Sequence, residues 1–150
     1  ILPCHTECFS ADVIKRLPDS VKIIANYSVG YDHVDTEAAK KRGVVITNTP
    51  DVLSDATAEL TMMLMIGAAR RASEGERMVR AREWKDWSPA FMVGTQVTGK
   101  RLGILGMGRV VAKRARGNNL EIHNHDVQAV HEEEAKDAIF HYTLEGMMNA

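Results

Sequence analysis

The sequence predicts an α/β fold with parallel strands, and two observations support that prediction. Short apolar segments typical of strands alternate with segments of helical character along the 150-residue chain. The segment 101–110, RLGILGMGRV, is typical of a strand that runs through a glycine turn into a helix. Hydrophobic residues form 45% of the chain and charged residues 26%, a balance typical of a folded globular protein.

The first third of the chain predicts two helix–strand pairs. Helices are expected over 9–17 and 35–42, and strands over 21–25 and 44–47. Ser10 is the expected N-cap of the first helix. The second helix has its acidic residues first and its basic residues last, which suits the helix dipole, and Gly43 is its expected C-cap.

One long helix is expected from Asp51 to about Ala81. Small and apolar residues recur there at spacings of three and four, the period of one helix face: Ala58, Met62, Met65, Ala69 and Ala72. Further apolar residues widen this face, so we expect the first half of the helix to be buried nearly all round. The second half, 70–82, is strongly charged and is expected to reach solvent.

The last third of the chain predicts three further strands separated by short helices. The strands are expected at the glycine segment, over 120–125 and over 138–141, and the helices over 110–116, over 132–136 and from 143 onward. His123 and His125 alternate along the middle strand and therefore point to the same side. A metal site or a proton shuttle fits such a pair, but exposed imidazoles at a strand end are more common, and we expect exposed side chains.

Composition and charge argue against several function classes. The net charge of −1 offers no basic patch for nucleic acid. The longest apolar run, 62–66, is far shorter than the roughly 20 residues that cross a bilayer, so no membrane partner is expected. The two cysteines predict a reducing, cytoplasmic setting. Cys4, His5 and Cys8 lack a second cluster at zinc spacing, so no metal is expected.

The glycine turn predicts a dinucleotide site. Gly106 and Gly108 stand where backbone N–H groups and a helix N-terminus meet a pyrophosphate without a Cβ between them. Asp126 follows the next expected strand, 20 residues after Gly106, which is the position of the acid that binds the ribose hydroxyls. Its carboxylate would repel a 2′-phosphate, so NAD is favoured over NADP.

Alternatives remain open for these features. Val111 stands where a third glycine is usual, and we expect it to push the helix outward or to change its register. A glycine pair followed by an acid also occurs in methyltransferases, and Asp126 also fits a solvated turn. Trp84 and Trp87 either fold back onto their own domain or anchor an arm in a partner subunit, because Trp is a frequent interface anchor.

Four motifs follow one another in an informative order. They are Ser28-Val29-Gly30-Tyr31-Asp32-His33-Val34-Asp35, Asn48-Thr49-Pro50, Ala56-Thr57-Ala58-Glu59 and Gly103-Ile104-Leu105-Gly106-Met107-Gly108-Arg109-Val110. Together they resemble the D-isomer-specific 2-hydroxyacid dehydrogenases, and most closely the glyoxylate/hydroxypyruvate reductase and glycerate dehydrogenase branch. The Trp pair after the long helix also fits that branch. The resemblance covers most of the chain and is strongest over about 20–116.

The resemblance implies two α/β domains with the active site between them. Residues 1–48 would be part of a flavodoxin-like substrate (lid) domain. Residues 49–150 would be part of a Rossmann-type NAD(P)-binding domain that begins with the long junction helix. The implied reaction is hydride transfer between NAD(P)H and a small 2-keto or 2-hydroxy acid of the glyoxylate, hydroxypyruvate or D-glycerate type. Trp84 and Trp87 would form the arm of a homodimer.

The resemblance also implies roles for individual residues. Val29 and Gly30 would offer backbone N–H groups to the substrate carboxylate. Thr57 would lie beside the phosphates or the nicotinamide of the cofactor. The residues that would hold the pyrophosphate are Gly106, Gly108, Arg109 and Val110.

The sequence departs from the family pattern in several places. About three residues, nearly one helical turn, are missing beside Val111, and 127–150 is shorter and less regular than in the family. No position matches the catalytic Arg, Glu or His of the family, so no catalytic residue is assigned. The sequence has no initiator Met, and we expect a fragment, an incompletely determined sequence or a degenerate relative. The alternative function is a catalytically inactive module that senses NAD or binds a partner.

Overall fold

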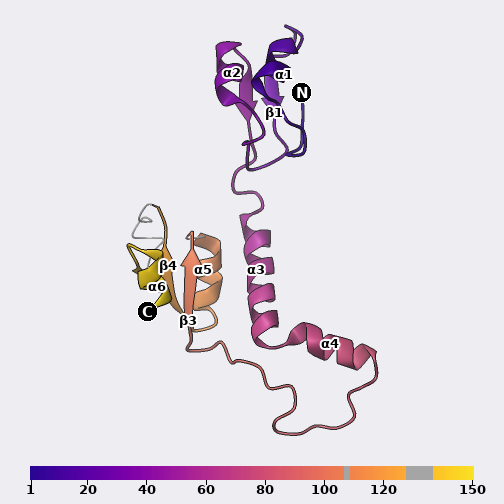
Figure 1. Ribbon diagram of the computed structural model, residues 1–150, viewed down its shortest axis with the longest axis vertical. Coiled ribbons are helices and arrows are strands. Elements are labelled where there is room, and N and C mark those ends of the chain that lie inside the picture. Colours follow the sequence, from indigo (N-terminus) through magenta and orange to yellow (C-terminus); the bar gives the residue numbers. More distant parts are fainter. Residues whose placement is uncertain (107–108, 128–136) are drawn as a thin grey trace. The chain divides into compact units, whose positions relative to one another are not determined.

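The computed structural model describes residues 1–106, 109–127 and 137–150, with Arg109 and Val110 described by their backbone alone. The chain forms two compact units, Ile1–Leu53 and Ser54–Ala150 (Figure 1). Both units contain parallel strands connected by helices, which confirms the predicted mixed α/β class. The boundary between the units falls after Leu53. The assignment of a substrate domain to 1–48 and a cofactor domain to 49–150 stays a prediction.

The first unit contains a two-stranded parallel sheet and two helices. Its elements are α1 (Ala11–Arg16), β1 (Ile23–Ala25), α2 (Thr36–Lys41) and β2 (Val45–Thr47). The N-terminal residues extend along β1. There, Ile1 O accepts from Ala25 N and Pro3 O accepts from Tyr27 N, each at 2.9 Å.

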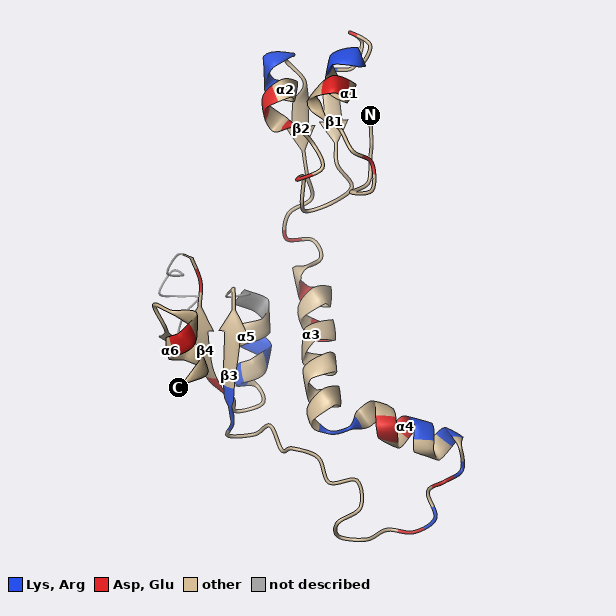
Figure 2. Cartoon of the chain, in the orientation of Figure 1, with Lys and Arg blue, Asp and Glu red and all other residues tan. Residues whose placement is uncertain are grey.

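Local signals place both helices of this unit. Ser10 Oγ accepts a backbone hydrogen bond at the start of α1, as predicted, and Asp35 Oδ1 accepts from Ala38 N at 2.8 Å at the start of α2. Acidic residues lie in the first turn of each helix and basic residues in the last turn (Figure 2). The C-cap of α2 is Arg42 rather than Gly43. Gly43 follows it with φ +69°, a conformation that glycine adopts without strain.

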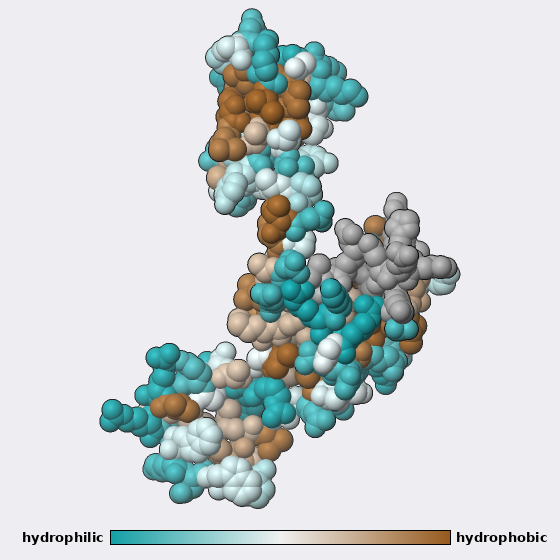
Figure 3. All heavy atoms as spheres, turned by 180° about the vertical axis from the view of Figure 1, so that it is seen from behind, coloured by the Kyte–Doolittle hydropathy of each residue, from teal (hydrophilic) through white to brown (hydrophobic). Residues whose placement is uncertain are grey.

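The core of the first unit lies on one face of its sheet. It consists of Phe9, Ile14, Ile24, Val34, Ala39 and Val44. Ile24 of β1 pairs with Ile46 of β2, and both face this core. Ile23 and Val45 pair on the opposite face, where they are exposed. Figure 3 shows hydrophobic side chains gathered on one side of this unit.

The second unit holds a three-stranded parallel sheet in the order β3-β4-β5. Its strands are β3 (Arg101–Leu105), β4 (Glu121–His125) and β5 (Ala138–Phe140), and its helices are α3 (Ser54–Ala69), α4 (Ala72–Arg80), α5 (Arg109–Arg116) and α6 (Leu144–Met148). All three strands fall within the segments predicted for them. The helical turn expected over 132–136 lies outside the described residues.

Helices lie on both faces of this sheet. α3 and α5 pack together on one face, where Met62 of α3, Ala115 of α5 and Ile122 of β4 are buried in one cluster. Alternate residues of β3 point to opposite faces. On the other face, a Cβ at Gly103 would meet the Met147 side chain of α6 at 3.6 Å. This distance is an ordinary van der Waals contact, so the Met147 side chain packs directly against β3.

An ion-pair cluster ties α5 to α3. Arg114 Nη2 lies 3.0 Å from Asp55 Oδ1 and 3.1 Å from Glu59 Oε1. Hydrogen bonds from the guanidinium to these two carboxylates raise the pKa of Arg114. The cluster flanks Thr57 in the sequence and holds the N-terminal half of α3 against α5.

The prediction of one long helix over 51–81 is wrong, because the chain forms two helices there. α3 ends at Ala69, α4 begins at Ala72, and Arg71 between them adopts the left-handed conformation with φ +58°. A later segment folds back onto this corner. Thr95 N donates to Ala69 O at 2.7 Å, and a Cβ at Gly94 would lie 2.6 Å from the same oxygen. No glycine or proline stands at 69–72, so no signal in the sequence marks the break.

The expected burial of the first half of this helix is wrong as well. The buried residues of α3 are Ala58 and Met62, whereas Leu60, Met63 and Leu64 are 53%, 60% and 61% exposed. Apolar side chains lie all around α3. In the described part of the unit, the side of α3 that is buried is the side that packs against α5. α4 has no buried residue, as expected for the charged second half. Within the described ranges, no helix has both the length and the apolar character of a membrane span.

Candidate functional site

The glycine turn begins where β3 ends. Gly106 has φ +75°, and a Cβ built on it meets no atom within 4 Å. Its N–H donates to His125 O at the end of β4, 2.9 Å away. The turn therefore opens beside the carboxyl ends of two parallel strands, the place where open α/β sheets bind their ligands.

α5 follows the turn and begins at Arg109. Gly108 lies outside the described residues, and Arg109 and Val110 show their backbone only, so their contacts with a pyrophosphate stay predictions. Val111, in the place of the usual third glycine, packs partly buried against the core of the unit, and Ala112 beside it is fully buried. α5 thus packs on the core through Ala112, and the outward shift or register change expected from Val111 stays a prediction.

Asp126 directly follows β4 and lies next to the strand end that Gly106 contacts. Its Oδ1 accepts from Val127 N at 2.7 Å. The structure thus brings together the two residues that the motif spacing pairs, Gly106 and Asp126. A pyrophosphate at the turn and a ribose at the tip of the second strand fit this arrangement.

The other predicted residues lie elsewhere. Thr57 is exposed in the first turn of α3, in the same unit as the glycine turn, and its carbonyl accepts from Thr61 Oγ1 at 2.8 Å. Val29 and Gly30 are exposed in the loop that follows β1, in the first unit. The substrate and cofactor candidates therefore belong to different units.

Hydrogen bonds occupy every carbonyl oxygen of the 28–30 loop. Ser28 O accepts from Thr49 N at 3.0 Å. Val29 O accepts from Asn48 Nδ2 at 2.8 Å. Gly30 O accepts from Ser28 Oγ at 2.7 Å. Within the fully described first unit, no protein acceptor takes the N–H of Val29 or Gly30. Free backbone donors at the surface suit an anion.

The histidines of β4 correct the expectation of exposed imidazoles. His123 is 6% exposed, with Nδ1 2.8 Å from His141 Nε2 and Nε2 2.8 Å from Glu121 Oε1. The rings of His123 and His141 stack with centroids 5.1 Å apart. His125 Nδ1 donates to His141 O at 2.8 Å. The sequence shows the alternation of His123 and His125, but not their partner, which follows the neighbouring strand.

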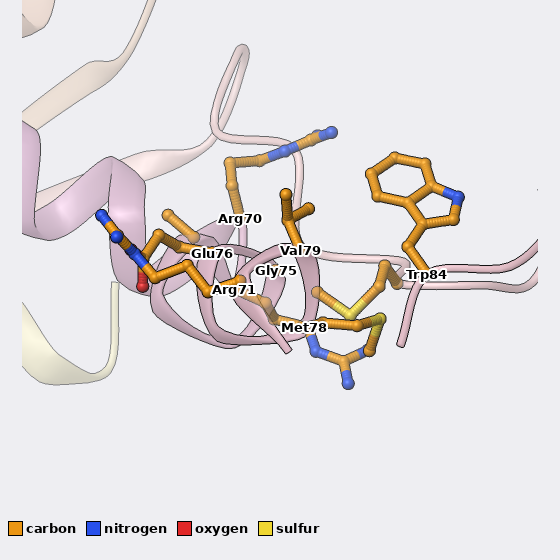
Figure 4. Close-up of a pocket in the computed structure, with 10 residues that line it drawn as sticks. Arg70, Arg71, Gly75, Glu76, Met78, Val79 and Trp84 are labelled. Carbon is orange, nitrogen blue, oxygen red and sulfur yellow. The ribbon is translucent and has the colours of Figure 1, made fainter. Parts of the chain in front are cut away.

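A pocket of about 520 Å³ lies along α4 (Figure 4). Met78 and Trp84 supply apolar atoms to it and Arg70 a guanidinium. Trp84 packs on Phe91 of its own segment, with ring centroids 6.0 Å apart, but is 54% exposed, and Trp87 is 75% exposed. Both interpretations of the Trp pair, an arm in a partner subunit or a pair folded back on its own domain, therefore stay open.

Arg71 holds the corner between α3 and α4. Its Nε and Nη2 donate to the two carboxylate oxygens of Glu74 at 2.8 and 2.6 Å. Its Nη1 also donates to Val93 O at 3.3 Å. The hydrogen bonds to the carboxylate lower the pKa of Glu74 and raise the pKa of Arg71.

The described residues were also compared with the ligand sets of metal sites. Across 1–106, 109–127 and 137–150, no three His, Cys, Asp or Glu side chains are placed to hold a metal ion. Cys4 and Cys8 are free and exposed.

Comparisons with known proteins connect this geometry to a family. The model of the family "D-isomer specific 2-hydroxyacid dehydrogenase, catalytic domain" matches residues 2–150. The glycerate dehydrogenase of Hyphomicrobium methylovorum is 41% identical over 143 residues, which cover 92% of this chain and 44% of that protein. The glyoxylate reductase of Pyrococcus horikoshii is 46% identical over 124 residues, which cover 78% of this chain and 37% of that protein. The chain thus spans less than half the length of these relatives.

Solved structures give the same result. A D-isomer specific, NAD-binding 2-hydroxyacid dehydrogenase from Polaromonas superposes with a TM-score of 0.90 at 45% identity, over 99% of this chain and 48% of that one. A glyoxylate reductase from Paecilomyes thermophila superposes with a TM-score of 0.81 at 37% identity, over 94% of this chain and 44% of that one. Because the family model matches residues 2–150, nearly the whole of this chain, the chain belongs to the D-isomer-specific 2-hydroxyacid dehydrogenase family.

Proposed function

We propose that the protein transfers a hydride between a nicotinamide cofactor and a small 2-keto or 2-hydroxy acid of the glyoxylate, hydroxypyruvate or D-glycerate type, in the cytoplasm. The names of its relatives, glycerate dehydrogenase and glyoxylate reductase, support this reaction class. The observation that carries the proposal is the turn at Gly106. It has a positive φ, open space where a Cβ would stand, and a hydrogen bond to the strand end that Asp126 follows.

The cofactor would lie at the glycine turn of the second unit. Its pyrophosphate would meet Gly106, Gly108 and the first turn of α5, with Arg109 and Val110, because free N–H groups at a helix N-terminus favour an anion. Asp126 would accept hydrogen bonds from the ribose, and Thr57 would lie beside the phosphates or the nicotinamide. When bound, the nicotinamide supplies or accepts the hydride.

The substrate carboxylate would accept hydrogen bonds from Val29 N and Gly30 N. Their exposure and the lack of a protein acceptor support this role. We assign no residue to the proton transfer that accompanies the hydride. A homodimer through the arm that carries Trp84 and Trp87 is part of the proposal, supported by the exposure of both indoles.

Asp126 provides the test of cofactor identity. A carboxylate at the ribose repels a 2′-phosphate, so we expect NADH to bind at least tenfold more tightly than NADPH, and Asp126→Ser to remove most of this preference. Fluorescence titration of each cofactor with the 150-residue chain measures both dissociation constants. Asp12→Ser, which removes an acid from the other unit, is the control. Equal affinity of the parent chain for the two cofactors would contradict the assignment of Asp126.

Turnover provides the test of the reaction. Oxidation of NADH or NADPH that depends on glyoxylate or hydroxypyruvate, measured with the protein at its natural length, is the expected result. Cofactor binding without any such turnover would favour the alternative, a module that senses NAD or binds a partner. If the protein binds neither NADH nor NADPH, both the dehydrogenase and the NAD-sensing function are wrong.

A further inference from the structure

We infer that Asn48 is a positioning residue that orients the backbone donors of Val29 and Gly30 toward the substrate carboxylate. This inference rests on the proposed function, because it concerns the loop proposed to bind that carboxylate. It adds a residue that motif comparison alone does not assign. The relevant geometry is that of two consecutive peptide groups in the first unit, all of whose residues are described.

Each proposed N–H donor shares a peptide plane with a carbonyl oxygen that accepts a hydrogen bond from the 48–49 segment. The N–H of Val29 belongs to the peptide whose carbonyl is Ser28 O, and that oxygen accepts from Thr49 N at 3.0 Å. The N–H of Gly30 belongs to the peptide whose carbonyl is Val29 O, and that oxygen accepts from Asn48 Nδ2 at 2.8 Å. The described peptides are trans, so each N–H points opposite to its carbonyl. Binding the carbonyls to the 48–49 segment therefore turns both donors away from that segment.

The two hydrogen bonds differ in how much they depend on sequence. Thr49 donates through its backbone, so most residues at that position keep the bond. The bond to Val29 O requires a side-chain donor of the right length at position 48. A carbonyl oxygen only accepts hydrogen bonds, so the Asn48 amide must present its nitrogen. Because β1 and β2 are parallel, the 28–30 loop after β1 and Asn48 after β2 leave the same end of the sheet, and the Asn48 side chain reaches Val29 O there.

A second asparagine of the same unit, Asn26, has a structural role and serves as a comparison. Asn26 is 3% exposed; its Nδ2 donates to Thr47 O at 3.0 Å, and its Oδ1 lies 3.0 Å from His33 Nε2. Asn26 thus joins β1, β2 and the following loop from inside. Asn48 makes one hydrogen bond at the surface, to the carbonyl that orients Gly30 N. Its loss is expected to change the loop and leave the unit folded.

The test measures anion binding by the backbone amides themselves, with oxamate as an unreactive 2-keto acid analogue. Titration of the ¹⁵N-labelled chain is expected to shift the Val29 and Gly30 amide resonances. Asn48→Ala is expected to weaken this binding about three- to tenfold, the loss that follows from one oriented hydrogen bond. Changes in the spectrum of the free chain are expected to stay within 28–31. Asn48→Gln, which keeps an amide donor, is expected to recover part of the affinity.

Thr47→Val is the matched control, because it changes a neighbouring polar side chain that makes no hydrogen bond to the 28–30 loop. It is expected to leave the oxamate affinity unchanged. If oxamate shifts Val29 and Gly30 equally in the parent chain and in Asn48→Ala, the inference is wrong and the proposed function stands. If oxamate shifts neither amide in the parent chain, the proposed carboxylate site is wrong, and the positioning role is wrong with it. Spectral changes throughout 1–53 in Asn48→Ala would show a structural role instead.

Discussion

Gly43 and Gly106 adopt nearly the same backbone conformation for different purposes. Their φ angles are +69° and +75°, and a Cβ on either would meet no atom within 4 Å. Gly43 ends a helix at the surface of the first unit, whereas Gly106 opens the turn where β3 ends. Substitutions at these two glycines can therefore distinguish the stability lost to backbone strain from the ligand affinity lost when a side chain fills the binding site.

Replacing each glycine by alanine is expected to destabilise the chain by a similar amount, about 1–2 kcal/mol, because an L side chain is strained in the left-handed region. Gly106→Ala is also expected to weaken NADH binding at least tenfold, since the new methyl group stands where the pyrophosphate would approach. Thermal unfolding and NADH fluorescence titration measure the two effects. A Gly43→Ala variant that lost NADH affinity equally would contradict the assignment of the turn.

The motif spacing predicted the neighbourhood of Gly106 and Asp126 because parallel strands end at one edge, and sequence distance then reports spatial position. The same reasoning did not find Asn48. Its role depends on a hydrogen bond to Val29, 19 residues earlier, and the Asn-Thr-Pro motif by itself indicates only a chain break. The burial of His123 was missed for a related reason, because its partner follows a neighbouring strand rather than its own.

Helix boundaries show the same division between local and non-local causes. α2 was predicted within a residue at each end, because Asp35, the charge order and Gly43 are all local signals. The break between α3 and α4 was not predicted, because it depends on contacts with 93–95, more than twenty residues along the chain. Arg71 tolerates a positive φ there while its guanidinium bonds Glu74 and Val93.

The Arg71–Glu74 pair predicts a pH dependence of this corner. The pKa of Glu74 is lowered in the folded chain, so the pair stabilises the corner above the unfolded carboxyl pKa, and this contribution is lost as pH falls through the lowered value. Arg71→Gln keeps a non-glycine residue at this φ but removes the charge. It is expected to lower the unfolding temperature more at pH 7 than at pH 2.5, and to return the Glu74 titration toward its ordinary range. Melting curves at both pH values and a ¹³C titration of the carboxyl measure these effects. An equal loss at both pH values would contradict the prediction.

Each unit of the molecule has its own buried cluster. One contains Ile24 of β1 and the other Ile122 of β4, at 0% and 1% exposure. Among the residues that the structure describes, none belongs to both clusters. The proposed roles divide in the same way, because the carboxylate donors lie in the first unit and the glycine turn in the second. Stability and ligand binding are therefore expected to respond unit by unit.

Ile24→Ala and Ile122→Ala form a reciprocal pair that tests this division. Each removes a fully buried isoleucine, which costs about 2–5 kcal/mol of folding free energy when the cavity does not collapse. Ile24→Ala is expected to speed amide hydrogen exchange throughout 1–53 and to leave the exchange of β3 and β4 and the NADH affinity unchanged, because the second core keeps all its contacts. Ile122→Ala is expected to do the reverse, and to weaken NADH binding because β4 carries Asp126 at its end. Exchange measured residue by residue distinguishes the two patterns, and faster exchange in both units for either variant would show that the two cores fold as one.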